Sequence, residues 1–198
     1  MFFEACIIGL LIGFIRKGNV RNFSSLRIRG WYFAILAVIL QLPIYKSELV
    51  PFAKDYILYI FIASSLLIFI TLLLNIDKKG TWLILLGAIL NIGVLFLNDM
   101  KMPIYMNGLE LAGMVDIAEK ITSGGITRFI PLENITDFTK FLGKYIVLPK
   151  PYPLAKVLSI GDVLMSIGLI VFIQGEMIRT KYKAKKTRMV ILGYNSKI

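Results

Sequence analysis

The sequence contains no histidine and a single cysteine, Cys6. Without histidine the chain cannot build a Ser-His-Asp or Cys-His catalytic group, a histidine-ligated metal site or a histidine-ligated haem. One cysteine allows neither an intrachain disulfide nor a cysteine-ligated zinc or iron–sulfur site. We therefore expect no metal and no cofactor, and we interpret Cys6 as a small apolar residue buried in the first apolar run.

Acidic residues are also scarce, with 12 Asp and Glu against 23 Lys and Arg in 198 residues, a formal net charge of +11. Hydrophobic residues make up 57% of the chain, above the roughly 45–50% of soluble domains. This composition predicts a membrane protein. A basic excess is typical of nucleic-acid binding, of contact with anionic lipid or of membrane topology, and its distribution along the chain decides between them.

Five apolar segments predict five membrane-spanning helices. They are residues 1–15, 31–45, 56–76, 81–98 and 157–178. The third and fifth reach the ~20 residues that cross a bilayer, and the other three are shorter. The charges between them favour membrane spans for the shorter segments as well.

Basic and near-neutral connections alternate along the chain. Residues 16–30 hold five basic residues and no acid, the turn 77–80 holds Lys78 and Lys79, and the tail 179–198 holds seven basic residues. The connections 46–55 and 99–156 are nearly balanced in charge. The positive-inside rule then places the N-terminus outside and the C-terminus in the cytoplasm. Most of the net charge is thereby explained as topology, and nucleic acid is not predicted as a partner.

The predicted fold is an all-α membrane protein with five transmembrane helices, N-out and C-in. Residues 1–98 form spans one to four, residues 99–156 an extracytoplasmic helical cap, residues 157–178 the fifth span, and residues 179–198 a basic cytoplasmic tail. The predicted location is a bacterial plasma membrane. The predicted partners are the lipid bilayer, a lipid or small-solute ligand, and other membrane proteins.

Two stretches of the cap have apolar residues at helical spacing, "LELAGMVDIAEKI" and "NITDFTKFLGKYIVL". We expect both to form amphipathic helices, the second with Asn134 as its N-cap.

Small residues recur at helical spacing in the first and fifth spans. They are Ala5, Gly9 and Gly13, and Gly161, Gly168 and Gly175. Such stripes let helices approach closely in lipid, so we expect these two helices to pack tightly against neighbours.

Polar groups gather near the predicted outer ends of the spans, and Asp162 lies inside the apolar run of the fifth. The residues of the candidate polar site are Asn91, Asn98, Asp99, Lys101, Ser159 and Asp162. A lone charge in that position costs several kcal/mol unless it is paired, protonated or hydrated. We predict that Asp162 pairs with Lys101, with Asn98 and Ser159 as further donors. Met102 and Pro103 then have the structural role of fixing the chain direction after the fourth span.

Three interpretations of this polar site remain open. In the first it is structural, because polar groups hydrogen-bond between helices and hold the cap down. In the second it binds a lipid headgroup, an ion or a small solute beneath the cap. In the third it is an intramembrane aspartic hydrolase, in which Asp99 and Asp162 share a proton. No glycine-rich aspartyl signature flanks either residue, and the predicted role is non-enzymatic: binding of a lipid or small solute near the outer face, or service as a membrane subunit of a larger assembly.

Three stretches carry a resemblance to a known family: "NDMKMP" (98–103), "FLGKYIVLP" (141–149) and "SIGD" (159–162). They resemble an uncharacterised family of multi-span bacterial membrane proteins with Asn-Gly-Gly-Arg-Met-Pro, Leu-Gly-Asp and Ser-x-Gly-Asp motifs. The resemblance implies a bacterial plasma-membrane protein and supplies no activity. Asp99 and Met100 stand where the family pattern has glycines, and Lys144 stands where it has Asp.

Overall fold

The computed structural model describes residues 1–45, 53–126, 128–135 and 137–195 of the chain, and most of them are helical. The elements, with η for a 3₁₀-helix, are α1 (Phe2–Ile15), η1 (Val20–Ser25), α2 (Trp31–Tyr45), α3 (Ala53–Leu74), α4 (Thr81–Leu97), β1 (Met102–Ile104), α5 (Met106–Leu111), α6 (Val115–Thr122), β2 (Phe129–Pro131), η2 (Leu132–Asn134), η3 (Phe138–Phe141), β3 (Ile146–Leu148), β4 (Lys156–Leu158) and α7 (Ile160–Asn195).

The five apolar segments all form helices. The first four become α1 to α4, with bounds within three residues of those predicted. The fifth, predicted to begin at residue 157, begins at Ile160 instead, because Val157 and Leu158 are paired in β4. It then continues as one helix of 36 residues to Asn195, so the predicted tail extends the helix. Residues 196–198 of that tail lie outside the described residues.

Length and composition distinguish α7 from the other helices. Within the described residues, the stretch Ile160–Ile178 is the single helical segment long and apolar enough to cross a membrane by itself. The other apolar helices fall below that length in their described parts: Phe2–Ile15, Trp31–Leu42, Tyr59–Leu74 and Thr81–Leu97. Helix length therefore does not establish the five predicted spans.

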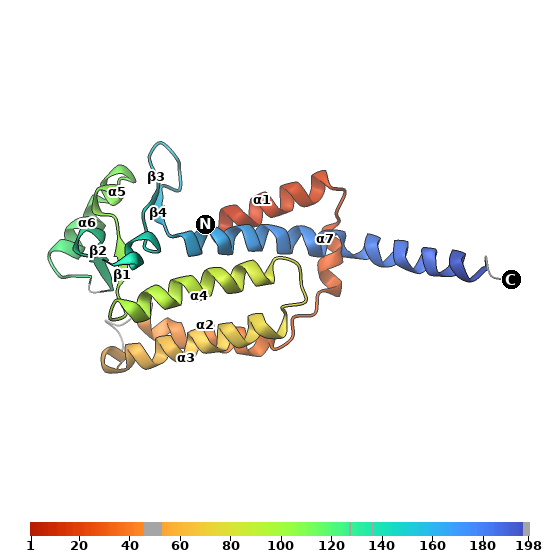
Figure 1. Ribbon diagram of the computed structural model, residues 1–198, viewed down its shortest axis with the longest axis horizontal. Helices are drawn as coiled ribbons and strands as arrows, with labels where there is room; N and C mark the ends of the chain where they lie inside the picture. Colours follow the sequence, from red (N-terminus) through yellow and green to blue (C-terminus); the bar gives the residue numbers. More distant parts are fainter. Residues whose placement is uncertain (46–52, 127, 136, 196–198) are drawn as a thin grey trace.

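Helix α7 lies at the centre of the bundle (Figure 1). It packs against α1 on one side and α4 on the other, α3 contacts α4, and α2 packs on α3. All of these helices run along the long axis of the molecule, and the segment 99–156 covers one end of them.

The small residues predicted to allow close packing lie at these contacts. Ala5, Gly9 and Gly13 are buried in α1, and Ile173 and Met177 of α7 cover the two glycines. On its other side α7 presents three glycines to α4 and the turn before it. A Cβ added to Gly161 would lie 2.7 Å from the Gly87 carbonyl oxygen, and one added to Gly168 would lie 2.7 Å from the Gly80 carbonyl oxygen. A Cβ added to Gly175 would lie 3.0 Å from the Lys79 Cβ. Backbone approach at this distance excludes larger residues.

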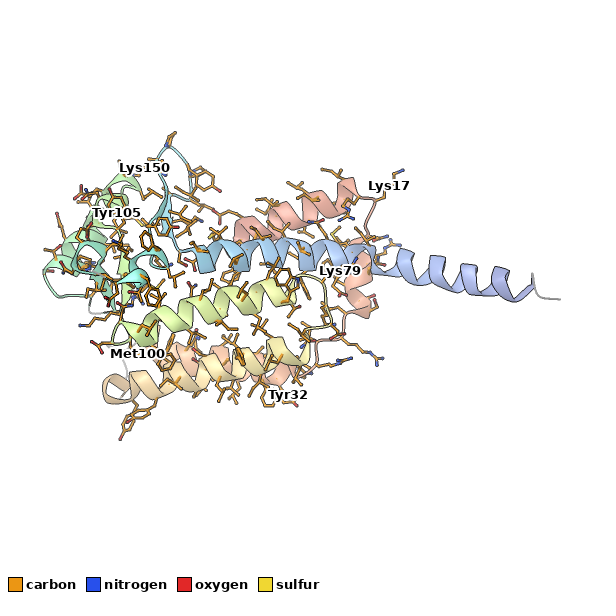
Figure 2. The ribbon with its side chains drawn as sticks, in the orientation of Figure 1. Lys17, Tyr32, Lys79, Met100, Tyr105 and Lys150 are labelled. Carbon is orange, nitrogen blue, oxygen red and sulfur yellow. The ribbon has the colours of Figure 1, made fainter. Side chains whose placement is uncertain are left out.

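The two basic connections between helices share one end of the bundle. The Asn19 N–H donates to the Met177 carbonyl at 3.0 Å, and the Arg29 N–H donates to Asn75 Oδ1 at 3.0 Å. Figure 2 shows Lys17 and Lys79 at this end, and Met100, Tyr105 and Lys150 at the cap end. The alternation of charge along the sequence thus corresponds to two ends of the molecule. The second connection lies outside the described residues at positions 46–52.

The first half of the cap is helical, as predicted, but broken. The stretch 109–121 forms the end of α5 and most of α6, separated at Gly113, whose φ of 71° belongs to the left-handed region. The apolar side of these helices forms the core of the cap with residues from the strands: Ile104, Leu109, Ala112, Ala118, Ile121 and Val157.

The prediction of a second helix in the cap is wrong. Residues 134–148 form η3 and β3, and Asn134 is the last residue of η2 instead of an N-cap. β3 pairs antiparallel with β4, and β1 pairs parallel with β2. A continuous helix here would lose the pairing of β3 with β4. It would also lose the close contact at Gly143, where an added Cβ would lie 2.9 Å from the Pro103 carbonyl oxygen. The all-α prediction therefore fails within the cap.

Candidate functional site

The stretch "SIGD" forms a capping box at the start of α7. Ser159 precedes the first helical residue, and its Oγ accepts the Asp162 N–H at 3.0 Å. In return, Asp162 Oδ2 accepts the Ser159 N–H at 3.2 Å. Two backbone donors that a helix start leaves unpaired are satisfied in this reciprocal way. Asp162 therefore lies in the first turn of α7, nearer the helix start than its position in the apolar run suggested.

Asn91 of α4 joins this box from the neighbouring helix. Its Nδ2 donates to Asp162 Oδ1 at 3.0 Å, and its Oδ1 accepts from Ser159 Oγ at 2.7 Å. The amide reaches these atoms because Gly161 has no side chain: a Cβ there would lie 2.7 Å from the Asn91 side-chain carbon. One predicted packing glycine and three predicted site residues thus form a single contact between α4 and α7.

The cation that pairs with Asp162 is Lys144 of the cap. Its Nζ lies 2.5 Å from Asp162 Oδ2, and the two side chains are only 23% and 17% exposed. β1 holds this lysine in position, because the Lys144 N–H donates to the Pro103 carbonyl at 2.8 Å. Pro103 and its neighbour Met102 are both buried, and their role in fixing the chain direction after α4 stays a prediction.

The predicted pair between Lys101 and Asp162 is wrong. After α4 the chain turns through Asp99 and Met100, whose φ angles of 51° and 62° are left-handed, and Lys101 is exposed.

Both oxygens of Asp162 have partners. Asn91 donates to one, and Lys144 and the Ser159 N–H donate to the other. Asp99 is not among these partners, and its side chain is exposed. An aspartic dyad requires two carboxylates that share a proton, so the geometry gives no support to a hydrolase built on Asp99 and Asp162. This arrangement is suited to holding the cap, α4 and α7 together.

Asn98 forms a separate tie between α4 and the cap. It ends α4, donates from Nδ2 to the Val94 carbonyl at 2.8 Å, and its Oδ1 lies 3.4 Å from Thr139 Oγ1 in η3. The structure therefore divides the six predicted site residues: Asn91, Ser159 and Asp162 meet, while Asn98, Asp99 and Lys101 lie elsewhere.

A third tie joins the cap to α1. Lys156 of β4 and the hydroxyl of Tyr152, the latter at 3.1 Å, both donate to Glu4 Oε1. Burial alone would lower the pKa of the Lys156 amine, but the hydrogen bonds to Glu4 and the N-terminus, together with the charge of Glu4, outweigh it and the pKa is raised. The same carboxylate raises the pKa of the Tyr152 phenol. The sequence contained no signal for this tie, because Tyr152 and Lys156 lie about 150 positions from Glu4 and share no local pattern with it.

Metal-ligating side chains do not gather at any of these ties. Among the described residues, no group of three or more His, Cys, Asp or Glu is placed to hold a metal ion.

Comparison with known proteins agrees with an uncharacterised family. An uncharacterized protein of Thermotoga maritima is 26% identical over 189 residues, which cover 96% of this chain and 98% of that protein. No solved structure matches the chain. A family described as "Family of unknown function (DUF5317)" matches residues 25–174, a range that includes Asn91, Lys144, Ser159 and Asp162. Because this match spans well over half of the 198 residues, the chain belongs to the DUF5317 family of unknown function.

Proposed function

We propose that this protein is a five-span integral protein of a bacterial plasma membrane, N-out and C-in, that binds a lipid or small solute without enzymatic activity near the outer face. The cap, residues 99–156, covers the outer ends of the spans. One observation carries the proposal: the helical bundle is apolar on its outside and polar at several points inside.

The outside of the bundle supports a lipid surrounding. Trp31 and Trp82, near the basic end of α2 and α4, are 59% and 56% exposed, and Tyr59 at the other end of α3 is 67% exposed. Large aliphatic residues such as Val38 and Leu66 are exposed between these two levels. Aromatic residues at both ends of an apolar surface are typical of helices that cross a bilayer.

The polar residues inside the bundle also support a lipid surrounding. Ser64 and Asn75 of the α3 region and Ser166 of α7 are buried. Each bonds within the protein: Ser64 to Phe61 O, Asn75 to Thr71 O, and Ser166 to Asp162 O. Polar side chains between helices and apolar ones outside reverse the arrangement of a soluble bundle.

The ties at the cap favour a positioning role for Asp162 over catalysis. The Asp162 carboxylate accepts from Lys144, Asn91 and Ser159, so it is held as a fixed ion pair. Fixed pairs of this kind position elements, here the cap over α4 and α7. The ligand class, a lipid or small solute, follows from the polar groups that collect where the cap meets an apolar bundle.

Cysteine labelling on intact cells tests the topology. We expect Glu119→Cys, on an exposed position of α6, to react with a membrane-impermeant maleimide added outside, and Lys183→Cys to react only after permeabilisation. Both variants carry Cys6→Ala so that no native thiol contributes. The reverse pattern of labelling would overturn the orientation. Release of the protein by an alkaline wash of the membranes would overturn the integral membrane placement itself.

A further inference from the structure

The loop between β3 and β4, residues 149–154 with the sequence PKPYPL, presents an apolar surface on the cap. All six residues are exposed, and Lys150 is the charged one. Tyr152 and Leu154 are 42% and 46% exposed although the adjoining strand residues Val157 and Leu158 are buried. A run of this composition has little reason to lie in open water, and marks an interaction surface.

The backbone of this loop has few unpaired donors. Three of its six residues are prolines, which have no N–H group. The Lys150 N–H donates to the Leu111 carbonyl at 3.3 Å, and the Tyr152 N–H donates to the Pro149 carbonyl at 3.1 Å. A segment that enters a region poor in water must satisfy its donors internally, and this loop largely does.

The position of the loop is fixed by α1. The Tyr152 hydroxyl donates to Glu4 in the first turn of that helix, next to Phe2 and Phe3, which are exposed. Figure 1 shows the loop turned across the direction of the helices, on the same side of α7 as α1. If α1 crosses the membrane, a loop with this direction at this level runs along the outer membrane surface beside α1.

We propose that loop 149–154 lies in the interfacial region of the outer leaflet and contacts lipid with Tyr152 and Leu154. The inference rests on the proposed function, because it takes α1 as a membrane span. Tyrosine suits this level since its ring is apolar and its hydroxyl polar.

Depth-dependent fluorescence quenching tests the proposal. Leu154→Trp is made with Trp31→Phe and Trp82→Phe, so that one tryptophan reports, and it leaves the Tyr152–Glu4 bond intact. The protein is reconstituted in phosphatidylcholine vesicles that contain lipids brominated close to the glycerol. Two matched variants carry the single tryptophan elsewhere: Ile89→Trp on the exposed side of α4, and Glu119→Trp on α6, which lies at the far end of the cap (Figure 1).

We expect Leu154→Trp to lose most of its emission and to emit at shorter wavelength than Glu119→Trp, which keeps its emission. If Leu154→Trp is unquenched while Ile89→Trp is quenched by lipids brominated deeper in the chains, the loop proposal is overturned and the membrane placement stands. If Ile89→Trp is also unquenched at every depth, both are overturned.

A spin label gives an independent readout that does not depend on a bulky indole. A nitroxide on Leu154→Cys, with Cys6→Ala, should be more accessible to oxygen relative to a water-soluble nickel complex than the same label on Glu119→Cys. Equal accessibility ratios at the two positions would overturn the loop proposal.

Discussion

At the scale of single residues, the carboxylate of Asp162 has two tasks. It closes the capping box of α7 through the Ser159 N–H, and it binds the Lys144 amine of the cap. A helix start and a cap contact therefore depend on one side chain. The charge also lies at a helix N-terminus, where the helix dipole favours an anion.

We predict that Lys144→Met lowers the free energy of unfolding by about 1–3 kcal/mol, because it leaves a largely buried carboxylate without its cation. We expect a smaller loss of stability than for a fully buried ion pair, because Asn91 and Ser159 still donate hydrogen bonds to Asp162. Lys101→Met is the matched control, and it should change stability by no more than ~0.5 kcal/mol since Lys101 is exposed. Unfolding in detergent measures both variants, and equal losses would contradict the assignment of the pair.

Part of the residue-scale detail was accessible from the sequence. The spacing Ser159-x-x-Asp162 before an apolar run is a capping-box signature and accounts for the carboxylate. The backbones of Asp99 and Met100 are both left-handed, a conformation that glycine adopts more readily than these residues. The partner Lys144 was not accessible, because it reaches Asp162 only through the pairing of the cap strands.

At the scale of elements, the contact between α4 and α7 depends on backbone approach. A Cβ on Gly87 would lie 2.5 Å from the Gly161 carbonyl oxygen and 2.9 Å from the Met165 nitrogen. These are backbone atoms of a central helix, which cannot move aside without shifting the bundle. Gly93 lies two turns further along α4 and a Cβ there would meet nothing within 4 Å.

We predict opposite effects for two identical substitutions in α4. Gly87→Ala should destabilise the protein by about 1–3 kcal/mol through overpacking. Gly93→Ala should be neutral or stabilise by about 0.5–1 kcal/mol, because alanine favours a helix over glycine. Thermal unfolding of both variants in one detergent provides the comparison, and a loss of similar size at Gly93 would mean that helix packing does not explain the result.

Helices could be predicted where the sequence pattern is local. The lengths of the apolar segments predicted the bounds of α1 to α4, and the stripes of small residues identified the packing faces of α1 and α7. The second half of the cap was not predictable in this way. β3 is held by β4, whose sequence comes after a loop, and β1 is held by β2 from 27 positions away (102 to 129). The spacing of apolar residues in 134–148 indicated a helix, and tertiary pairing overrode it.

At the scale of the whole molecule, three of the apolar helices are shorter than the bilayer in which we propose that they lie. α1, α2 and α4 have 14, 15 and 17 residues, which correspond to about 21–26 Å of helix against a hydrocarbon core of about 30 Å. If these helices span a membrane, as we propose, the protein thins the lipid around it or selects thin lipid.

We predict that the protein is more stable in bilayers of short-chain than of long-chain phosphatidylcholine. The temperature of unfolding in nanodiscs of matched headgroup and graded chain length measures this preference. A maximum in the longest chains would contradict this prediction, because it would mean that the apolar length of the protein matches a thick bilayer.

The central place of α7 has a consequence for how the chain assembles during synthesis. Gly9 of α1 meets Ile173 of α7, 164 positions later (9 to 173). At about 5–20 residues per second, the ribosome needs about 8–33 s to supply that partner. Until then the glycine-containing faces of α1 and α4 both lack their packing partner, because α7 covers both of them in the folded protein. A chain interrupted before residue 160 has no native way to cover either one, so the bundle forms only once translation has passed through α7.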